Sequence, residues 1–325
     1  MSEPTVVVTD WEFSDLSVEQ GVLDAAGIAL RGAQSRDPAE IAASAQDATA
    51  LLVQYATVDG DLMDRLPSLE LIVRYGVGLD TIDLAAAEQR EIAVCNVLDY
   101  GTEEVAAHSA ALLFAVHRHV HQLDRQIRGG GWNYRGTGTI PRLSEMTLGC
   151  VGFGRIGQLT AERLAPWFAR VLAHDPYAPA ATWPADVERR ELDDLLPDAD
   201  VLSLHLPLTE ETAGLLGAQR LARLPRGSLL VNTARGGLVD LDALQRLLDD
   251  GHVRGAGLDV LPQEPPPADH PIRTHPKVLL TPHGAWYSEP AERDLRRMAA
   301  EQIVAWARGE RPPFLAAGPA PAGAR

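Results

Sequence analysis

Short apolar runs alternate with amphipathic segments along most of the chain. In the first hundred residues the candidate strands are residues 5–10, 50–55, 69–75 and 92–97, separated by helix-like stretches such as SVEQGVLDAAG and DLAAAEQRE. A second block runs from Thr147 to about Leu280, with strands expected near residues 148–153, 171–173, 201–206, 229–231, 257–260 and 278–280. Such alternation is typical of parallel sheets covered by helices. The pattern therefore predicts an α/β fold.

One long helix is predicted between the two blocks, from Glu103 to Arg128. Its apolar positions recur at spacings of three and four residues: Val105, Leu112, Leu113, Val116, Val120, Leu123 and Ile127. A helix of about 26 residues would span about 39 Å, enough to cross from one domain to another. The run GGG at residues 129–131 should end it. His117 and His121 could in principle pair on a metal, but we interpret them as a solvated helix face or a subunit contact and predict no metal site.

The pattern of residues in the last part of the chain predicts one more helix, followed by a tail. After Glu289 an amphipathic pattern places Leu295, Met298, Ile303 and Trp306 on one stripe. The segment RPPFLAAGPAPAGAR is rich in Pro, Ala and Gly, so its end is expected to be disordered.

Length and composition narrow the class of protein. A chain of 325 residues is longer than a single hydrophobic core usually accommodates, so two domains are expected. The formal net charge of −16 disfavours nucleic acid and anionic membranes as partners and favours a cytoplasmic protein. No apolar run is long enough for a membrane span, and MSEPTVVVTDW does not resemble a secretion signal. Cys95 and Cys150 lie in predicted strands, so neither a disulfide framework nor a Cys-ligated zinc site is expected.

A glycine motif opens the second block. TLGCVGFGRIGQLTAERLA places Gly152, Gly154 and Gly157 in the pattern G-x-G-x-x-G, between an apolar strand and a helical run. The first glycine allows the tight turn, the second lets the backbone approach a pyrophosphate, and the third lets helix and strand pack closely. The helix N-terminus then offers free N–H groups and a partial positive charge. This context predicts a dinucleotide site, whereas the glycines alone would fit a turn without a ligand.

The next strand indicates which dinucleotide binds. RVLAHDPY ends at Asp175, 23 residues after Gly152. A carboxylate there accepts hydrogen bonds from the adenosine ribose hydroxyls and repels a 2′-phosphate. No Arg or Lys stands between Pro176 and Pro184 to neutralise such a phosphate. We therefore predict NAD rather than NADP.

Polar residues follow three later strands, and the carboxyl ends of parallel strands meet at the ligand edge of such a sheet. Arg235 comes after SLLV, Asp259 and Glu264 after GAGL, and His283 after KVLL. A histidine can exchange the hydroxyl proton of a 2-hydroxy acid while a hydride leaves the same carbon. A nearby carboxylate would orient the ring and favour its protonated form. An arginine can hold a substrate carboxylate in a fork of two hydrogen bonds.

Each of these residues also has an ordinary explanation. Arg235 fits a surface charge, Glu264 a loop residue before prolines, and His283 a turn between Pro282 and Gly284. Their occurrence together on successive strand ends of a dinucleotide fold favours the redox interpretation. Arg235, Glu264 and His283 are therefore predicted to be catalytic.

At these motifs the chain resembles the D-isomer-specific 2-hydroxyacid dehydrogenases. The resemblance covers nearly the whole chain and is carried by GFGRIGQ, LHLPLTEET, LVNTARGGLVD, GAGLDVLPQEP and TPHGAW. It implies two Rossmann-like, doubly wound parallel-sheet domains with the active site in the cleft between them. It places a discontinuous substrate domain at residues 1–99 plus 289–325 and the NAD-binding domain at residues 100–288. It also implies a homodimer formed through the cofactor domain and its long helix.

The resemblance extends the predicted NAD site and supplies a substrate site. The implied cofactor-binding residues are Gly152, Gly154, Arg155, Ile156, Gly157, Asp175, His205, Pro207, Thr212, Ala234, Asp259 and Gly284. Among them, Arg155 and Ile156 would meet the pyrophosphate, and the Ala234 carbonyl and Asp259 would hold the nicotinamide carboxamide. VRYGVGLDTID resembles the substrate loop of the family, in which the N–H groups of Val77 and Gly78 would bind the substrate carboxylate.

Within the family, LIVRYGVGLDTID, IAVCNV, VNTARGGLVD and HGAWYSE look most like the C-terminal-binding-protein branch. That likeness adds Arg74 as a second carboxylate ligand and Trp286 as a wall of the substrate pocket. The function expected is hydride transfer between NAD(H) and a small D-2-hydroxy acid or 2-oxo acid. Two alternatives stay open: an NAD(H)-sensing, corepressor-like binding protein, and a phosphoglycerate dehydrogenase, which would need a second anion site built from Arg74, Arg135 or Arg142.

Overall fold

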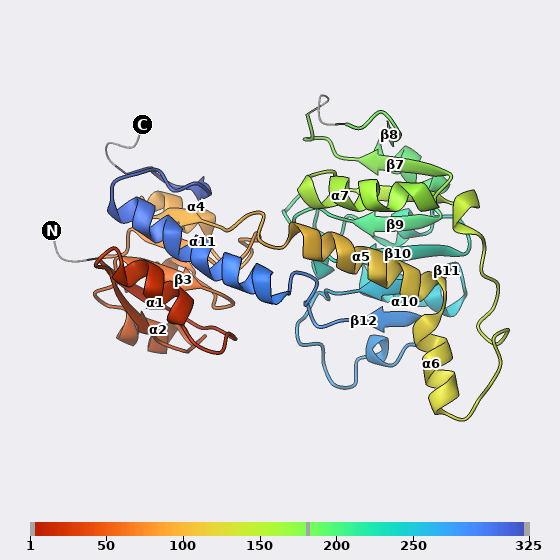
Figure 1. Cartoon of the computed structure of the whole chain (residues 1–325), viewed down its shortest axis with the longest axis horizontal. Coiled ribbons are helices and arrows are strands. Elements are labelled where there is room, and N and C mark those ends of the chain that lie inside the picture. Colours follow the sequence, from red (N-terminus) through yellow and green to blue (C-terminus); the bar gives the residue numbers. More distant parts are fainter. Residues whose placement is uncertain (1–3, 180–182, 322–325) are drawn as a thin grey trace. The chain divides into compact units, whose positions relative to one another are not determined.

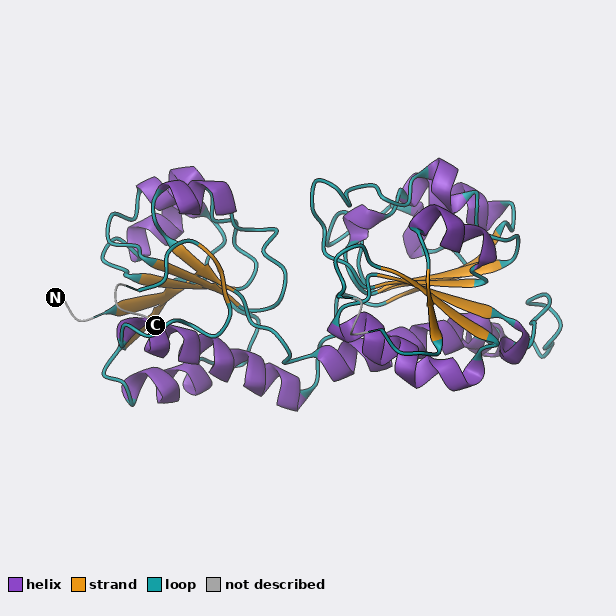
Figure 2. Ribbon diagram, turned by 90° about the horizontal axis from the view of Figure 1, so that it is seen from above, coloured by secondary structure: helices purple, strands orange, loops and turns teal. Residues whose placement is uncertain are grey.

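The computed structural model describes residues 4–179 and 183–321. The chain divides into two units, each with its own sheet: unit 1 is Met1–Gly101 with Ser288–Arg325, and unit 2 is Thr102–Tyr287 (Figure 1). The boundaries expected from the sequence, after residues 99 and 288, differ from these by two residues and one residue. In both units the strands lie between helices on either side (Figure 2).

In unit 1, the described strands form one sheet in the order β13-β5-β4-β3-β1-β2. The five strands β1 (Thr5–Val8), β2 (Ala29–Gly32), β3 (Ala50–Val53), β4 (Leu71–Arg74) and β5 (Ala93–Cys95) are parallel. The last strand, β13 (Leu315–Ala317), pairs antiparallel with β5. Reversal of strand order at β1 and β3 places the end of β1 beside the end of β3, the position where ligands bind in doubly wound sheets.

The helices of unit 1 are α1 (Ser17–Asp24), α2 (Pro38–Ser44), α3 (Gly60–Asp64), α4 (Leu84–Gln89) and α11 (Glu289–Ala307). Short polar side chains cap all of them except α1, which begins after Leu16. Asp59, Asp83 and Ser288 each accept a hydrogen bond from a backbone N–H in the first turn of the following helix. The returning α11 packs against α1 and β4, so the C-terminal segment completes this unit.

In unit 2, the described strands form an all-parallel sheet in the order β12-β11-β10-β9-β6-β7-β8. The strands are β6 (Thr147–Val151), β7 (Arg170–His174), β8 (Val187–Arg189), β9 (Val201–Leu204), β10 (Ser228–Asn232), β11 (Val253–Leu258) and β12 (Val278–Leu280). The chain runs outward from β6 to β8 and then returns to β9 on the other side of β6. This reversal makes the ends of β6 and β9 the expected ligand site of the sheet.

Helices cover both faces of the second sheet. The helices of this unit are α5 (Thr102–His117), α6 (Val120–Arg128), α7 (Arg155–Leu164), α8 (Leu192–Leu195), α9 (Ala218–Leu221) and α10 (Leu241–Asp249), of which α6 buries none of its residues. α5 packs on β10, β11, β12 and α7, with Leu112, Leu113 and Val116 buried against the sheet. The core is apolar and almost wholly buried, which is the pattern expected of strands covered on both faces.

The prediction of one helix from Glu103 to Arg128 is wrong. α5 ends at His117, and α6 begins at Val120. Between them His119 adopts the left-handed conformation, with φ of 54°, which an α-helix cannot contain. The spacing of apolar residues continues through the break, so periodicity alone did not reveal it. The chain therefore has no 39-Å helix at this position, and α6 leaves the sheet in a new direction (Figure 1).

The histidines at this break do not lie on a solvated face. His117 and His119 are buried, and Nδ1 of His117 lies 3.2 Å from Nη2 of Arg254. Burial, together with the Arg254 charge, lowers the pKa of His117 to about 4, so the ring is neutral at physiological pH. Within residues 4–179 and 183–321, no three His, Cys, Asp or Glu side chains are arranged to hold a metal ion.

The three strands missed by the sequence analysis all lie at sheet edges. β2, β8 and β13 each pair on one side only, and most of their residues are exposed or half-buried. β13 falls in the Pro- and Ala-rich tail, whose final residues, 322–325, lie outside the described residues together with residues 1–3 and 180–182.

No helix in the described part of the chain is long and apolar enough to cross a membrane. Cys95 and Cys150 are buried free thiols.

Candidate active site

The glycine motif follows β6 at the point where the strand order reverses. Gly152 has φ of 86°, and a Cβ atom there would lie 2.5 Å from the carbonyl carbon of His205, the residue after β9. Glycine is therefore required by both the left-handed backbone and the close approach of the two strand ends. The loop passes directly over the neighbouring strand end as a result.

The N-terminus of α7 is open beside this loop. Gly154 caps the helix and is exposed, and a Cβ atom at this position would contact no atom within 4 Å. Arg155 is exposed and Ile156 is half-buried in the first turn, whereas Gly157 is buried beneath the loop. Free N–H groups of this turn and the partial charge of the helix end suit a pyrophosphate. The residues present therefore fit a bound dinucleotide.

Asp175 lies just beyond β7 and folds back onto the glycine loop. Its Oδ2 accepts a hydrogen bond from the Phe153 N–H at 2.8 Å, and its Oδ1 accepts from the N–H groups of Tyr177 and Ala178 at 2.9 and 3.0 Å. A carboxylate has about four lone-pair positions, so capacity for a ribose hydroxyl remains.

A cation that the sequence analysis did not consider lies beside this loop. Nη2 of Arg189, on the edge strand β8, lies 3.5 Å from the Asp175 carbonyl oxygen. The sequence argument covered residues 176–184, part of which is outside the described residues, and did not include a side chain returning from β8. Detection from sequence would have required knowing that β8 pairs with β7.

The loop after β9 carries three of the predicted cofactor residues. His205 is half-buried, and its Nε2 lies 2.8 Å from the Ser203 hydroxyl. Burial lowers the pKa of His205 to about 4, which keeps the ring neutral. Thr212 donates its hydroxyl proton to the carbonyl of Pro207 at 2.8 Å and so closes the loop on itself.

Two loops that carry predicted catalytic residues are packed together at Gly236. A Cβ atom on Gly236 would lie 1.9 Å from the carbonyl carbon of Leu261, so only glycine fits between these backbones. Arg235 stands immediately before this contact and Glu264 three residues after it. The guanidinium of Arg235 donates a hydrogen bond to the Ala234 carbonyl at 2.7 Å.

His283 and Glu264 are in direct contact. Nδ1 of His283 lies 2.7 Å from Oε2 of Glu264, and the other carboxylate oxygen accepts a hydrogen bond from the Leu261 N–H at 2.8 Å. Partial burial acts to raise the pKa of Glu264, but the His283 contact, the Leu261 N–H and the Arg235 charge together hold it below its ordinary value. The carboxylate is therefore ionised at neutral pH, with its charge directed at the imidazole.

The turn that carries His283 is built around Asp259. This buried carboxylate accepts hydrogen bonds from the Thr281 hydroxyl at 2.6 Å and from the N–H groups of Gly284 and Ala285 at 3.0 and 2.9 Å. Its carbonyl accepts from the His283 N–H at 2.8 Å. His283 itself has φ of 54°, a conformation that costs free energy for a non-glycine residue and persists only where its surroundings impose it.

Comparison with known proteins decides the family. Residues 110–285 match the model of the D-isomer specific 2-hydroxyacid dehydrogenase, NAD binding domain. A glyoxylate reductase of Thermofilum pendens is 38% identical over 265 residues, covering 79% of this chain and 78% of that protein. The chain belongs to the D-isomer specific 2-hydroxyacid dehydrogenase family. It carries the NAD-binding domain of that family, with β6 to β12 as its sheet.

Two further 2-hydroxyacid dehydrogenases show how far the likeness extends. The D-3-phosphoglycerate dehydrogenase of Mycobacterium leprae is 40% identical over 298 residues, which cover 90% of this chain but 55% of that enzyme. The chain thus spans about half the length of the phosphoglycerate dehydrogenases that it matches. The D-lactate dehydrogenase of Aquifex aeolicus, solved with NAD and lactic acid, has a TM-score of 0.85 at 27% identity, covering 94% of this chain and 96% of that one.

The residues predicted to bind substrate lie mostly in unit 1, at the carboxyl end of β4. Arg74 is half-buried and packs over Gly76, while Val77 is 46% exposed. Asn96 donates its side-chain amide to the Val77 carbonyl at 2.8 Å, and Val97 donates its N–H to the Gly76 carbonyl. The loop that contains Gly78 is therefore held from β5. Trp286 belongs to unit 2 and packs edge-on against Tyr287.

Two polar residues of α5 contact the catalytic loops, and the sequence analysis missed both. Nε2 of His108 lies 3.0 Å from the Thr281 hydroxyl, and the Ser109 hydroxyl lies 2.7 Å from the Thr233 hydroxyl. Ser109 is buried between the apolar residues Ala106 and Leu112 of the same helix face. This interruption of the apolar stripe was the available signal, since a buried polar residue needs a partner.

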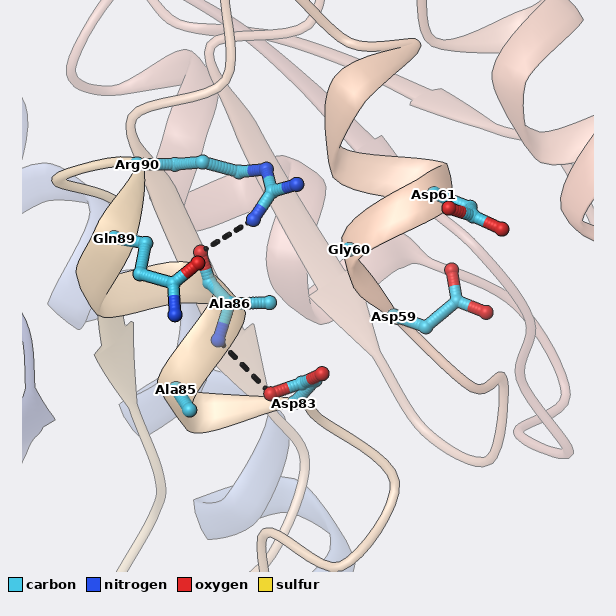
Figure 3. Close-up of a pocket in the computed structure, with 8 residues that line it drawn as sticks. All are labelled: Asp59, Gly60, Asp61, Asp83, Ala85, Ala86, Gln89 and Arg90. Carbon is cyan, nitrogen blue, oxygen red and sulfur yellow. Dashed lines mark hydrogen bonds between the residues drawn. The ribbon is translucent and has the colours of Figure 1, made fainter.

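A pocket of unit 1 has no part in this site. It has a volume of about 420 Å³ and lies between α3 and α4, where Asp59, Asp61, Asp83 and Arg90 line it (Figure 3). Asp59 and Asp83 already cap their helices, and Arg90 binds Asp64 and the Ala86 carbonyl. None of the predicted catalytic or cofactor residues borders this pocket.

Proposed function

We propose that the chain is an NAD-dependent oxidoreductase acting between a small D-2-hydroxy acid and the corresponding 2-oxo acid. The observation that carries the proposal is the 2.7 Å contact between Nδ1 of His283 and an ionised Glu264, beside Arg235 and on the same sheet edge as the glycine loop. NAD, when bound, accepts or supplies the hydride at the substrate carbon.

His283 moves the proton that accompanies the hydride. Because the Glu264 carboxylate only accepts hydrogen bonds, Nδ1 carries a proton, and Nε2 is the nitrogen that faces a substrate. In reduction Nε2 gives its proton to the carbonyl oxygen of the 2-oxo acid, and in oxidation it takes the hydroxyl proton. The adjacent negative charge stabilises the imidazolium that exists on one side of this exchange.

The remaining assignments belong to the same proposal. Arg235 holds the substrate carboxylate and polarises the neighbouring carbonyl oxygen. Arg74 and the N–H groups of Val77 and Gly78 bind the carboxylate, and Trp286 contacts the substrate side chain. The cofactor residues predicted from the sequence bind NAD in the same proposal. Among them, the Ala234 carbonyl and Asp259 hold the nicotinamide carboxamide.

A substrate panel tests the function. NADH consumption is measured with pyruvate, glyoxylate, hydroxypyruvate, phenylpyruvate, 4-methylthio-2-oxobutyrate and phosphohydroxypyruvate. Turnover of at least one unphosphorylated 2-oxo acid is expected, since the aromatic ring of Trp286 offers apolar contact area and no positive charge for a phosphate. Tight NADH binding without turnover of any member would refute the proposal.

Two other outcomes would identify the alternatives. The phosphoglycerate dehydrogenases among the relatives keep a phosphorylated substrate in consideration, although the chain spans 55% of the one from Mycobacterium leprae. Activity confined to phosphohydroxypyruvate would select that variant. NADH binding that changes the assembly state, with no turnover, would instead select the sensing role suggested by the likeness to the C-terminal-binding-protein branch.

We expect Asp175→Ala to raise the ratio of kcat/KM with NADPH to kcat/KM with NADH by at least about tenfold. The substitution removes a carboxylate that repels a 2′-phosphate and leaves Arg189 close by as a positive charge. The double variant Asp175→Ala/Arg189→Ala should lose most of that gain. Equal use of NADPH and NADH by the unsubstituted protein would show that Asp175 does not set the preference.

We also propose that the protein is a cytoplasmic homodimer assembled through unit 2. α6 buries none of its residues, and Val120 and Ile127 on it are 55% and 51% exposed. Trp132 and Tyr134 in the following loop are 88% and 73% exposed. Clustered apolar exposure of this kind is typical of an interface. Sedimentation should give about twice the chain mass of 35.0 kDa, and a monomer at micromolar concentration would contradict the proposal.

A further inference from the structure

We propose that His108 is a positioning residue for the acid–base histidine, acting through Thr281 and Asp259. The inference rests on the proposed function, because it assigns how α5 keeps His283 in place for proton transfer. The geometry points to a chain of three side chains that begins on the helix and ends at the backbone of the catalytic turn.

The contacts form one continuous path within unit 2. Nε2 of His108 lies 3.0 Å from the Thr281 hydroxyl, which lies 2.6 Å from Oδ1 of Asp259. The Asp259 carboxylate then binds the N–H groups of Gly284 and Ala285, on the far side of His283 from Thr281. Asp259 is 2% exposed, so these hydrogen bonds are shielded from water.

The number of protons available on these side chains determines which atom donates in each hydrogen bond of this path. Thr281 has one hydroxyl proton, which it donates to Oδ1 of Asp259 at 2.6 Å. The Thr281 oxygen is then an acceptor toward His108, so Nε2 of His108 must carry a proton. The network therefore assigns His108 the Nε2–H tautomer, a property that packing alone would not determine.

The path matters because His283 needs external support. Its left-handed backbone is unfavourable by itself, and its N–H bonds to the Asp259 carbonyl at 2.8 Å. Asp259 thus holds the turn from both sides of His283, through its carboxylate and through its carbonyl. His108 fixes the Thr281 hydroxyl that orients this carboxylate, and α5 is fixed in turn by its packing on β10, β11 and β12.

The test is a double-mutant cycle with a conservative rescue. His108→Leu removes the donor, and Thr281→Val removes the hydroxyl while keeping its shape; each should lower kcat about tenfold with little change in NADH affinity. The double variant should be no slower than the worse single variant, because both break the same path. His108→Gln, which keeps an N–H near the Nε2 position, should stay within about threefold of the parent protein.

A histidine outside the network provides the matched control. The side chain of His252 bonds through Nε2 to the Leu224 carbonyl at 2.8 Å and contacts none of the residues of the path, so His252→Leu should leave kcat within about twofold. Rates are measured with NADH and the 2-oxo acid of the panel that is turned over fastest. Losses that multiply in the double variant, or His108→Gln as impaired as His108→Leu, would overturn the proposal.

A second readout does not depend on turnover. In protein labelled with ¹⁵N-histidine, long-range ¹H–¹⁵N spectra should show His108 as the Nε2–H tautomer, with its signals assigned by their loss in His108→Leu. In Thr281→Val the tautomer preference should weaken. Failure of every 2-oxo acid in the panel would defeat the proposed function while leaving this spectrum to decide the network; an Nδ1–H tautomer would defeat the network even in an active enzyme.

Discussion

His283→Ala is expected to lower kcat about 10³-fold while leaving the dissociation constant of NADH nearly unchanged. Loss of a positioned general acid–base group typically costs between about 10² and 10⁴ in rate. Nδ1 of the His283 imidazole contacts the ionised Glu264 carboxylate, which leaves Nε2 to exchange a proton with the substrate. Single-turnover kinetics with NADH and the best 2-oxo acid, with NADH fluorescence titration, measure both quantities.

A companion substitution tests the electrostatic part of this expectation. The pKa of Glu264 lies below its ordinary value, so its charge is present throughout the neutral range and is lost only as pH falls below that range. Glu264→Gln keeps the shape and removes the charge, so the rate of reduction should reach its half-maximum at a lower pH. An unchanged pH profile, or NADH binding weakened as much as turnover in His283→Ala, would show that these roles are misassigned.

Arg296→Leu is expected to lower the free energy of unfolding of unit 1 by about 3–5 kcal/mol. Arg296 on α11 and Glu19 on α1 form a buried ion pair, with Nη2 2.8 Å from Oε2 and side-chain exposures of 5% and 0%. Removing the guanidinium leaves the buried Glu19 carboxyl group with the Tyr75 hydroxyl, 3.0 Å away, as its remaining side-chain hydrogen-bond partner among the described residues. Urea denaturation followed by circular dichroism measures the loss.

The neighbouring arginine is the matched control for this stability prediction. Arg297 also forms ion pairs, with Glu301 and Asp294, but its side chain is 43% exposed. Because exposed pairs contribute little, Arg297→Leu should change the free energy of unfolding by less than about 1 kcal/mol. A Glu19→Met/Arg296→Met double variant should be more stable than Arg296→Leu, since it leaves no unpaired buried charge. Equal losses for Arg296→Leu and Arg297→Leu would refute the buried-pair argument.

Strands buried on both faces were readable from the sequence, and edge strands were not. The runs at residues 50–55, 148–153 and 201–206 are apolar because helices cover them, and each overlaps an observed strand. β2, β8 and β13 pair on one side and keep exposed residues, so no apolar run marks them. The omission had a functional consequence, because the side chain of Arg189 on β8 reaches Asp175.

The break between α5 and α6 shows the limit of periodicity in another way. The apolar spacing from Val105 to Ile127 fits one helix, yet His119 is left-handed. Nothing in the local pattern distinguishes these two outcomes, because helix propensity is weak and tertiary packing overrides it. The buried contact of His117 with Arg254 of β11 is a long-range feature of this junction.

The sequence by itself determined the layered α/β fold, the glycine loop and the identities of the residues that follow each strand, since all three are expressed over a few neighbouring positions. Tertiary structure decided which of those residues meet. The contact of His283 with Glu264, the packing of Gly236 on Leu261, and the path from His108 to Asp259 join segments 19 to 173 residues apart. Such contacts depend on strand order and on side-chain direction, and no local pattern of apolar and polar positions records either.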